Sequence, residues 1–331
     1  MLAVLATRKP VDLSRTPWPD VQRTAAEHDI RIVTADHLTS HEYDLTAAVV
    51  IADDWTRDVE RLIVGGAASA VLLSFEPPIT AWRLYYHLER ISAQFAHSFL
   101  YEGARERVAP TTWFHPLYWP VPCPPPRPTG LPWPGRRFMV AMCDYADAPE
   151  PRNIARTVAG LRYRPIARHR YTARLRAFEA FAARDDFDLY GEGWDSHQPL
   201  AGAYRGTAED ALSLLARYRF ALVYEDARFN GYITDGILNC FFARCVPIYS
   251  GAPDIAQYVP PAAFIDVRQF QSFPELQHFL ERTTEEDARR YVDAARAFMI
   301  SPRFESWCAE RFARDLVEAL LAVAGVQQRT S

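Results

Sequence analysis

The sequence predicts an α/β protein built from two parallel-sheet domains, and three observations lead to this prediction. Short apolar runs alternate with helical patterns along the whole chain, which is typical of strands and crossover helices in doubly wound sheets. The length of 331 residues fits two domains. Nine prolines crowd the segment from Pro116 to Pro134, where neither a helix nor a central strand is expected.

Before the prolines, apolar runs predict buried strands and helical periodicity predicts helices between them. The strands are expected at residues 2–6, 30–33, 47–51 and 70–73, and the helices at 19–28 and 56–64. After the prolines, strands are expected at residues 138–142, 187–190, 220–224, 246–249 and 263–267. Helices are expected there at 173–183, 208–216, 233–243, 274–281 and 285–299, and a last amphipathic helix at 305–324.

These elements divide the chain into four parts. We expect a first domain over residues 1–115, a proline-rich linker over 116–135 and a second domain over 136–304. The C-terminal segment, 305–331, is able to pack back on the first domain. Two doubly wound domains joined in this way place a ligand cleft between them, at the carboxyl ends of the strands.

Composition and charge exclude several classes of protein. The net charge of −4 argues against general nucleic-acid binding, which needs a basic face. The cysteines show no CxxC pair and no histidine at metal-ligand spacing, so we expect reduced thiols at Cys123, Cys143, Cys240, Cys245 and Cys308. The first apolar run is too short for a signal peptide, and no run is long enough to span a bilayer. We therefore expect a soluble cytoplasmic protein. Contact with a membrane surface is left open, although nothing indicates it.

The most informative segment covers residues 219–270. Its first apolar run ends in the acidic pair Glu225-Asp226, and Thr234 or Asp235 is placed to cap the helix that follows. A helix N-terminus that faces a cleft is a ready site for a phosphate group. The next strand ends in a tight turn at Gly251, where the backbone is able to approach a ligand.

This segment resembles the donor-binding signature of the α1,3-fucosyltransferase family, glycosyltransferase family 10. The matching motifs fall at the family's spacing, and they are Tyr224-Glu225-Asp226, Gly231-Tyr232-Ile233-Thr234, Val246-Pro247-Ile248-Tyr249, Gly251-Ala252-Pro253, Tyr258-Val259-Pro260 and Phe264-Ile265-Asp266. Weaker matches lie at residues 186–194 and at Ser74-Phe75-Glu76-Pro77-Pro78. The chain thus looks like a divergent, bacterial-type member of this family.

The resemblance implies a GT-B fold, in which two Rossmann-like domains face a cleft. It also implies an inverting sugar transfer by single displacement, with a GDP-sugar as donor substrate, most often GDP-fucose, and no separate cofactor. The second domain would bind the nucleotide sugar. The first domain would bind the acceptor, which is a glycan or another hydroxyl-bearing molecule.

Glu76 is the candidate catalytic base. It follows a predicted strand and precedes two prolines, which hold the backbone and prevent a helix from starting at once. An inverting transfer needs a base on the acceptor hydroxyl, and burial of a carboxylate at a strand end raises its pKa and makes it a better base. The alternatives are a solvated loop glutamate and a glutamate that supplies negative charge to the N-terminus of a helix from Ile79 onward.

Arg174 is the candidate partner of the diphosphate. Six arginines lie within residues 162–176, and the family resemblance places one arginine of this segment on the phosphates. A guanidinium is always charged and its fork of donors suits phosphate oxygens. Arg170 and Arg176 remain alternatives, as does Arg228 in the later loop, and a solvated helix face is the ordinary explanation for any one of these arginines.

Further donor-site candidates are Glu225, Asp226, Tyr232, Thr234 and Asp235. Carboxylates suit the hydroxyl donors of a ribose or a sugar, whereas Tyr232 is as readily explained by packing against the helix. Where the family has glutamate and lysine after the threonine, this chain has Asp235 and Gly236. The missing lysine leaves three explanations open. Another arginine takes its place, the nucleotide-sugar donor is a different one, or the protein is a catalytically weak or non-catalytic relative that binds sugar nucleotides or glycans.

No metal site is expected. Asp186 and Asp188 have the Asp-x-Asp spacing by which some glycosyltransferases hold a divalent cation. They enter a predicted strand, however, and the family resemblance does not rest on that motif.

Overall fold

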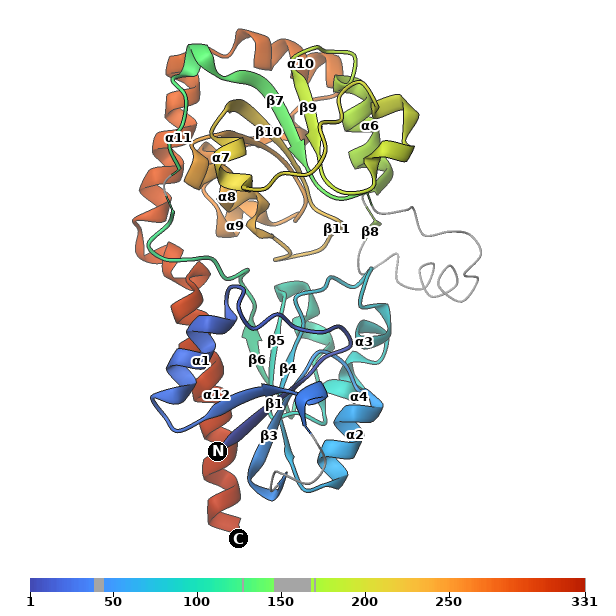
Figure 1. Ribbon diagram of the computed structural model, residues 1–331, viewed down its shortest axis with the longest axis vertical. Coiled ribbons are helices and arrows are strands. Elements are labelled where there is room, and N and C mark those ends of the chain that lie inside the picture. Colours follow the sequence, from blue (N-terminus) through green and yellow to red (C-terminus); the bar gives the residue numbers. More distant parts are fainter. Residues whose placement is uncertain (39–44, 127, 146–167, 170, 331) are drawn as a thin grey trace. The chain divides into compact units, whose positions relative to one another are not determined.

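A computed structural model of the chain describes residues 1–38, 45–126, 128–145, 168–169 and 171–330. The chain forms two compact units, each with its own parallel sheet (Figure 1). The first unit combines Met1–Pro124 with Glu305–Ser331, and the second is Pro125–Phe304. The expected linker over 116–135 is therefore divided between the units at Pro124, and the C-terminal segment belongs with the first unit.

The first unit contains a six-stranded sheet in which every neighbouring pair of strands is parallel. Its order is β2-β1-β3-β4-β5-β6, with β1 Leu2–Ala6, β2 Arg31–Thr34, β3 Ala48–Ala52, β4 Ala68–Leu73, β5 His97–Leu100 and β6 Trp113–Pro116. Every residue of β3 is buried, because the strand is covered on both faces as the apolar sequence requires.

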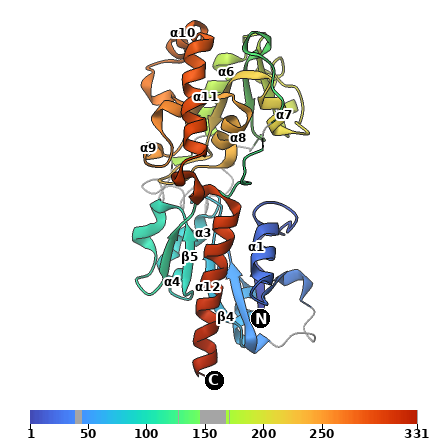
Figure 2. The same cartoon turned by 90° about the vertical axis from the view of Figure 1, so that its left-hand side faces the viewer.

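The helices of the first unit are α1 Trp18–Ala26, α2 Arg57–Val64, α3 Trp82–Tyr86, α4 Leu88–Ser92 and α12 Ala309–Thr330. Thr56 caps α2 by accepting a hydrogen bond from the backbone N–H of Val59. The long α12 comes from the end of the chain, yet it packs along α1 and against β4 (Figure 2). Its apolar stripe, with Leu316 and Leu320 fully buried, completes the core of this unit.

The second unit contains a five-stranded parallel sheet of order β13-β12-β10-β7-β9. Its strands are β7 Arg137–Met142, β9 Phe187–Tyr190, β10 Tyr218–Tyr224, β12 Val246–Ser250 and β13 Ile265–Asp266. A separate antiparallel pair joins β8 Arg168–His169 to β11 Ala227–Arg228. The helices are α6 Tyr171–Phe181, α7 Ala211–Leu215, α8 Asp235–Ala243, α9 Ile255–Tyr258, α10 Phe273–Arg282 and α11 Glu285–Met299.

Most predicted elements are confirmed with ends shifted by a few residues. The expected helix at 285–299 has the bounds of α11, and the expected strand at 187–190 has those of β9. Strands β5 and β6 of the first sheet were not predicted, because both are short and mix histidine with aromatic residues. The two-residue strands β8 and β11 and the short helices α3, α4 and α9 were not predicted either. Strand β6 ends at Pro116 and lies at the edge of its sheet, where a missing N–H donor is tolerated.

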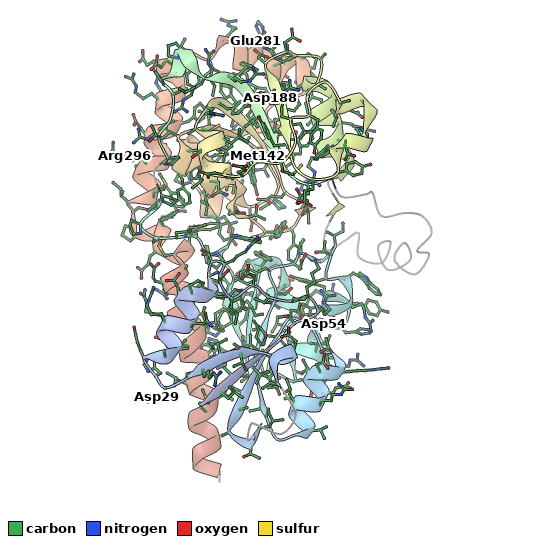
Figure 3. The ribbon with its side chains drawn as sticks, in the orientation of Figure 1. Asp29, Asp54, Met142, Asp188, Glu281 and Arg296 are labelled. Atoms are coloured by element: carbon green, nitrogen blue, oxygen red, sulfur yellow. A yellow bond between two sulfur atoms is a disulfide. The ribbon has the colours of Figure 1, made fainter. Side chains whose placement is uncertain are left out.

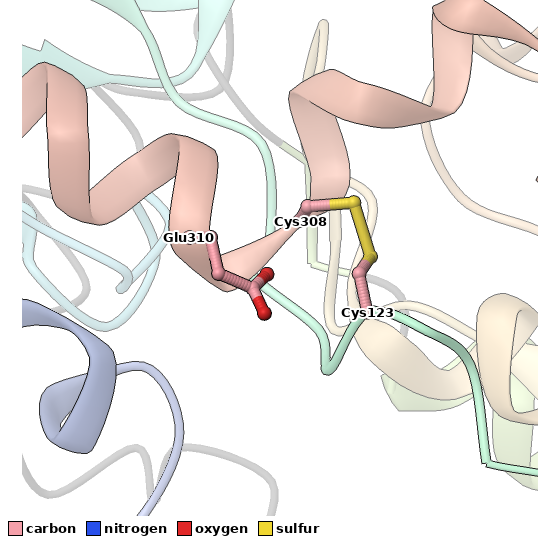
Figure 4. Close-up of side chains that lie close together, drawn as sticks. All are labelled: Cys123, Cys308 and Glu310. Atoms are coloured by element: carbon pink, nitrogen blue, oxygen red, sulfur yellow. A yellow bond between two sulfur atoms is a disulfide. The ribbon is translucent and has the colours of Figure 1, made fainter.

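A disulfide joins Cys123 to Cys308 (Figure 4). The expectation of five reduced thiols is therefore wrong for this pair, whereas Cys143, Cys240 and Cys245 are free. The two cysteines are 185 residues apart in sequence, so no spacing motif predicts that they form a disulfide. The backbone also brings them together, because Val121 accepts a hydrogen bond from the N–H of Ala309 and donates one to the carbonyl of Trp307.

None of the helices within the described ranges combines the length and the apolar character that a membrane-spanning helix requires.

Replacing Cys123 with serine should lower the free energy of unfolding by about 2–5 kcal/mol, because the unfolded chain loses a constraint that closes a long loop. Urea denaturation without reductant measures this loss. The double variant Cys123→Ser/Cys308→Ser should be no less stable than either single variant, since both remove the same bond.

Thiol titration of the denatured protein provides the control. We expect three reactive thiols before reduction, from Cys143, Cys240 and Cys245, and all five cysteines after it. Five thiols before reduction would show that the bond is absent from the isolated protein. Because disulfides are rare in a reducing cytosol, the result also bears on the cytoplasmic expectation.

Candidate functional site

A pocket of about 320 Å³ lies in the second unit, where β7 and β10 end and α8 begins. Five of the predicted donor-site residues line it, namely Arg174, Glu225, Asp226, Thr234 and Asp235. The carboxyl ends of parallel strands are the usual place for a ligand in an α/β sheet. The structure therefore brings together in one pocket the residues that the sequence singled out after β10 and before α8.

Glu225 is held inside the protein, with 3% of its surface exposed. Its two carboxyl oxygens accept hydrogen bonds from the backbone N–H and the hydroxyl of Thr234, each at 2.9 Å. Burial raises the pKa of Glu225 to about 8, against the lowering effect of these two hydrogen bonds. This carboxyl group thus positions the start of α8, although it also forms part of the pocket wall.

Gly251 makes room for this arrangement. A Cβ atom at this position would overlap the side chains of Glu225 and Tyr249. The tight turn after β12 was expected to let the backbone approach a ligand. In the structure its close approach is to Glu225, so the glycine serves the burial of that carboxyl group.

The first turn of α8 is capped from within. The Thr234 hydroxyl oxygen accepts a hydrogen bond from the N–H of Gly236 at 3.4 Å. Asp235 accepts one from the Asn239 side chain at 2.9 Å, and burial raises the pKa of Asp235. The partial positive charge of the helix start faces these acids, and it would favour an anionic ligand in the same place.

Arg174 projects from α6 into the same pocket and has 5% of its surface exposed. Its Nη1 lies 2.7 Å from Oδ1 of Asp226, whose side chain is 51% exposed. A buried guanidinium opposite a half-exposed carboxylate is a site where an incoming phosphate competes for the same charge. Arg176 lies on the exposed face of α6, and Arg170 is outside the described residues.

Tyr232 is buried and is not among the side chains that line this pocket, so its position agrees with the packing interpretation. Asn239 and Cys143 line the pocket and were missed. The four-residue spacing from Asp235 to Asn239, which puts both on one face of a helix, was a usable signal for the first. Nothing in the sequence pointed to Cys143, which comes directly after β7.

Gly236 occupies the position of the family lysine. A Cβ atom there would lie 3.3 Å from Cγ1 of Val223 and 3.6 Å from the Thr234 hydroxyl. A longer side chain therefore fits after a small movement of Val223. Glycine in place of the expected lysine therefore removes a positive charge. The backbone conformation at position 236 does not itself require glycine.

The Asp-x-Asp pair makes ion pairs and hydrogen bonds within the protein. Asp188, labelled in Figure 3, is buried, and its carboxylate meets the guanidinium groups of Arg137 and Arg205 and the hydroxyl of Tyr218. Asp186 pairs with Arg184 at 2.8 Å. These partners explain the two carboxylates as structural groups of the sheet edge at β9.

Glu76 lies in the first unit, three residues after the end of β4. Its Oε1 is 3.2 Å from the ammonium group of Lys9, the single lysine of the chain. Its backbone is held on two sides, because the hydroxyl of Tyr85 donates to its carbonyl and its N–H donates to the Ser74 hydroxyl. These hydrogen bonds fix the backbone of Glu76 at the carboxyl edge of the sheet, whereas its side chain is partly exposed.

The part of the chain that contains this pocket resembles known proteins. A family model described as glycosyltransferase family 10 (fucosyltransferase), C-terminal part, matches residues 165–309. A 4-galactosyl-N-acetylglucosaminide 3-alpha-L-fucosyltransferase of Pan troglodytes is 34% identical over 140 residues, which is 41% of this chain and 36% of that protein. An alpha-(1,3)-fucosyltransferase of Helicobacter pylori is 33% identical over 118 residues, or 32% of this chain and 24% of that protein. The chain thus matches 36% and 24% of the length of these two relatives.

Solved structures extend the likeness to most of the chain. An α1,3-fucosyltransferase with GDP-fucose superposes with a TM-score of 0.51 at 15% identity, covering 89% of this chain and 81% of that one. Anabaena HepE with UDP and glucose superposes with a TM-score of 0.60 at 10% identity, covering 97% and 100%. These identities are low, so the structures establish the fold alone, and the expected GT-B fold is confirmed.

Replacing Glu225 with glutamine should remove a pH dependence of stability. The pKa of Glu225 rises from its ordinary 4.5 to about 8 on folding, so the native state keeps a proton that the unfolded chain releases. This contribution favours the folded protein below pH 4.5 and is lost as the pH rises to about 8. Urea denaturation across this range should show a steeper loss of stability for the wild type than for Glu225→Gln.

The exposed Glu286 on α11 provides the matched control, and Glu286→Gln should keep the wild-type slope. Equal slopes for the wild type and Glu225→Gln would mean that Glu225 does not hold its proton in the native state.

Proposed function

We propose that the chain transfers a sugar from a nucleotide donor to an acceptor hydroxyl, on the basis that its residues 165–309 match the family model of glycosyltransferase family 10. The observation that carries the proposal is the pocket of the second unit. There a buried arginine, the start of α8 and several carboxyl groups converge at the carboxyl ends of the strands. Such a combination suits a ligand with a diphosphate and many hydroxyl groups.

GDP-fucose is the donor that we propose. The curated relatives are named as fucosyltransferases, and one structural neighbour holds GDP-fucose. Gly236 is the feature that favours a second candidate, because it removes a positive charge that the family uses near the diphosphate. A GT-B transferase with a different nucleotide sugar is that second candidate, and Anabaena HepE, which binds UDP and glucose, shares the fold.

The proposed reaction is a single displacement with inversion at the anomeric carbon. The acceptor oxygen forms the new glycosidic bond as the bond from the anomeric carbon to the diphosphate breaks, and the acceptor's proton passes to a base. We assign the base to Glu76, because its backbone is fixed by Tyr85 and Ser74 while its carboxylate stays partly exposed. The acceptor is a glycan or another hydroxyl-bearing molecule, and its binding is assigned to the first unit.

The leaving diphosphate needs positive charge, and we assign this role to Arg174 and the start of α8. Within the pocket Arg174 is balanced by Asp226, so phosphate oxygens would replace that carboxylate on the guanidinium. The helix start supplies only a fraction of a charge, and an uncompensated diphosphate in a partly dry pocket is costly. Asp235 and Asp226 are then available for hydroxyl groups of the ribose or the sugar.

A thermal-shift panel tests the donor. GDP, UDP, dTDP and CDP sugars are added to the protein, and a ligand that binds only the folded state raises its melting temperature. The proposal expects the largest shift with GDP-fucose and release of GDP when an acceptor glycan is added. A larger shift with a UDP sugar would favour the second candidate. Binding without turnover on any glycan acceptor would instead favour a non-catalytic relative.

Replacing Glu76 with glutamine should slow transfer by about 10²–10⁴-fold, because glutamine cannot accept the acceptor's proton. Affinity for GDP should stay within about twofold, since Glu76 belongs to the other unit and is not part of the donor pocket. Initial rates and calorimetric GDP titration measure the two quantities. Transfer by Glu76→Gln at the wild-type rate would remove Glu76 from the mechanism.

Replacing Arg174 with alanine should weaken GDP binding by about 1.5–3 kcal/mol, the value of a hydrogen bond to a charged group. Calorimetry gives the affinity, and a melting curve confirms that the variant is folded. Arg176→Ala is the matched control, because Arg176 lies on the exposed face of the same helix and should leave GDP affinity unchanged. If both variants bind GDP like the wild type, another group holds the diphosphate.

A further inference from the structure

A second cavity lies entirely within the first unit, beside the edge of its sheet. It has a volume of about 500 Å³, a size typical of small-molecule sites. Strands β5 and β6 form one wall and α12 forms the other. The side chains that line it are His97, Phe99, His115, Pro116, Leu117, Tyr118, Ser306, Arg311, Phe312, Asp315, Glu318 and Ala319. Neither Glu76 nor any donor-site candidate is among them.

A pair of histidines forms the polar centre of the sheet-side wall. Nδ1 of His97 lies 3.1 Å from Nε2 of His115, and the His115 ring stacks on Phe99 with centroids 4.3 Å apart. Burial lowers the pKa of both imidazoles, and the neighbouring His97 lowers that of His115 further, to about 4, although Asp315 acts in the opposite direction. Both rings are therefore neutral near pH 7.

Two neutral imidazoles joined in this way always present one donor and one acceptor to the cavity. If His97 donates to His115, then Nε2 of His97 accepts and Nδ1 of His115 donates, and the other tautomer reverses both roles. Among the described residues, neither outer nitrogen has a protein hydrogen-bond partner. A hydroxyl group both donates and accepts, so either tautomer of the pair is able to bind it.

The charges of the opposite wall exclude an anionic ligand. Arg311 is already paired, with its Nε 2.8 Å from Asp315 Oδ1 and its Nη1 3.7 Å from Glu305. Glu318 adds a further carboxylate to the lining. A phosphate or carboxylate ligand would meet these acids without an unpaired cation, and its desolvation would be uncompensated. The cavity therefore suits a neutral ligand that carries several hydroxyl groups.

Aromatic surface accompanies these polar groups. Phe99 and Phe312 line the cavity and lie 6.0 Å apart in an edge-to-face arrangement. Trp113 is 69% exposed, and it lies two residues before His115 on β6, so both point to the same face of the sheet. An exposed indole next to hydrogen-bonding groups is a surface on which the C–H face of a sugar ring packs.

From these features we propose that this cavity is a saccharide-binding site, separate from the donor pocket, that takes a neutral saccharide of one to a few sugar units. The histidine pair and the acids of α12 bind the hydroxyl groups, and Trp113 stacks on a sugar ring at the rim. The proposal does not depend on sugar transfer. It would hold for a transferase that binds a glycan at a part of the glycan distant from the reacting hydroxyl, and equally for a protein that only binds glycans.

Binding of neutral saccharides to the full chain tests the proposal without any use of activity. A panel of lactose, cellobiose, maltotriose and chitobiose is screened by saturation-transfer NMR, and the affinity of each hit is measured by calorimetry with GDP present at saturation. We expect at least one hit, with an affinity that GDP does not reduce. Inorganic phosphate and glucose 6-phosphate should not compete with it.

Two variants locate the site. His115→Phe keeps a ring on Phe99 but removes the hydrogen-bonding nitrogens, and Trp113→Ala removes the exposed indole. Each should weaken the affinity about three- to tenfold, the factor for one neutral hydrogen bond or one aromatic contact. His278→Phe, on the exposed face of α10 in the second unit, is the matched control and should bind like the wild type.

Three results would overturn the proposal, namely no saccharide bound from the panel, full competition by GDP, or unchanged affinity in both variants. Trp113 is exposed, so Trp113→Ala remains informative if His115→Phe fails to fold. The thermal-shift panel of nucleotide sugars tests the pocket of the second unit, which is a different site. A negative saccharide-binding result therefore does not contradict the proposed sugar transfer, and a negative nucleotide-sugar result does not contradict the saccharide site.

Discussion

The buried contact between Glu225 and Thr234 organises the second unit's pocket. Glu225 directly follows β10, Thr234 is the N-cap residue of α8, and the two hydrogen bonds between them set where the helix starts relative to the sheet. The cost of burying a carboxyl group is reduced because Glu225 keeps its proton up to a pKa of about 8. Gly251 is required for the same contact, since the side chain of any larger residue would displace Glu225.

The charge state of this contact matters for the ligand that we propose. A neutral Glu225 does not repel a diphosphate at the start of α8, whereas an ionised one would. Asp235 also has a raised pKa through burial. The pocket therefore combines two acids whose pKa values are raised with one arginine, Arg174. The ion-pair partner of Arg174 is the half-exposed Asp226, which a phosphate group would be able to replace. This balance offers a physical reason why the pocket would be able to hold a diphosphate without a lysine at position 236.

The first unit depends on a different constraint, namely that the C-terminal segment of the chain packs back on it. Residues 305–331 rejoin the unit, and α12 covers β4 and lies along α1. The Cys123–Cys308 bond ties the place where the chain leaves this unit to the place where it comes back. Without α12 the second cavity would have only one wall, because its acids and Phe312 all come from that helix. The proposed saccharide site is thus a product of this return.

Local patterns in the sequence predicted most of the helices and strands, the resemblance to glycosyltransferase family 10 and five of the residues that line the pocket of the second unit. These features depend on neighbours a few residues apart, which the sequence displays directly. Strands β5 and β6 were not predicted from the sequence, because short strands with mixed side chains have no clear periodicity.

Only the tertiary structure decided the partners of the side chains. It joined Arg174 to Asp226, 52 residues away, turned Glu225 inward to Thr234, and bonded Cys123 to Cys308 across 185 residues. It also brought His97 and His115 into contact through the parallel register of two strands that the sequence did not reveal. Such contacts depend on how distant segments pack, and packing leaves no periodic trace in the order of the residues.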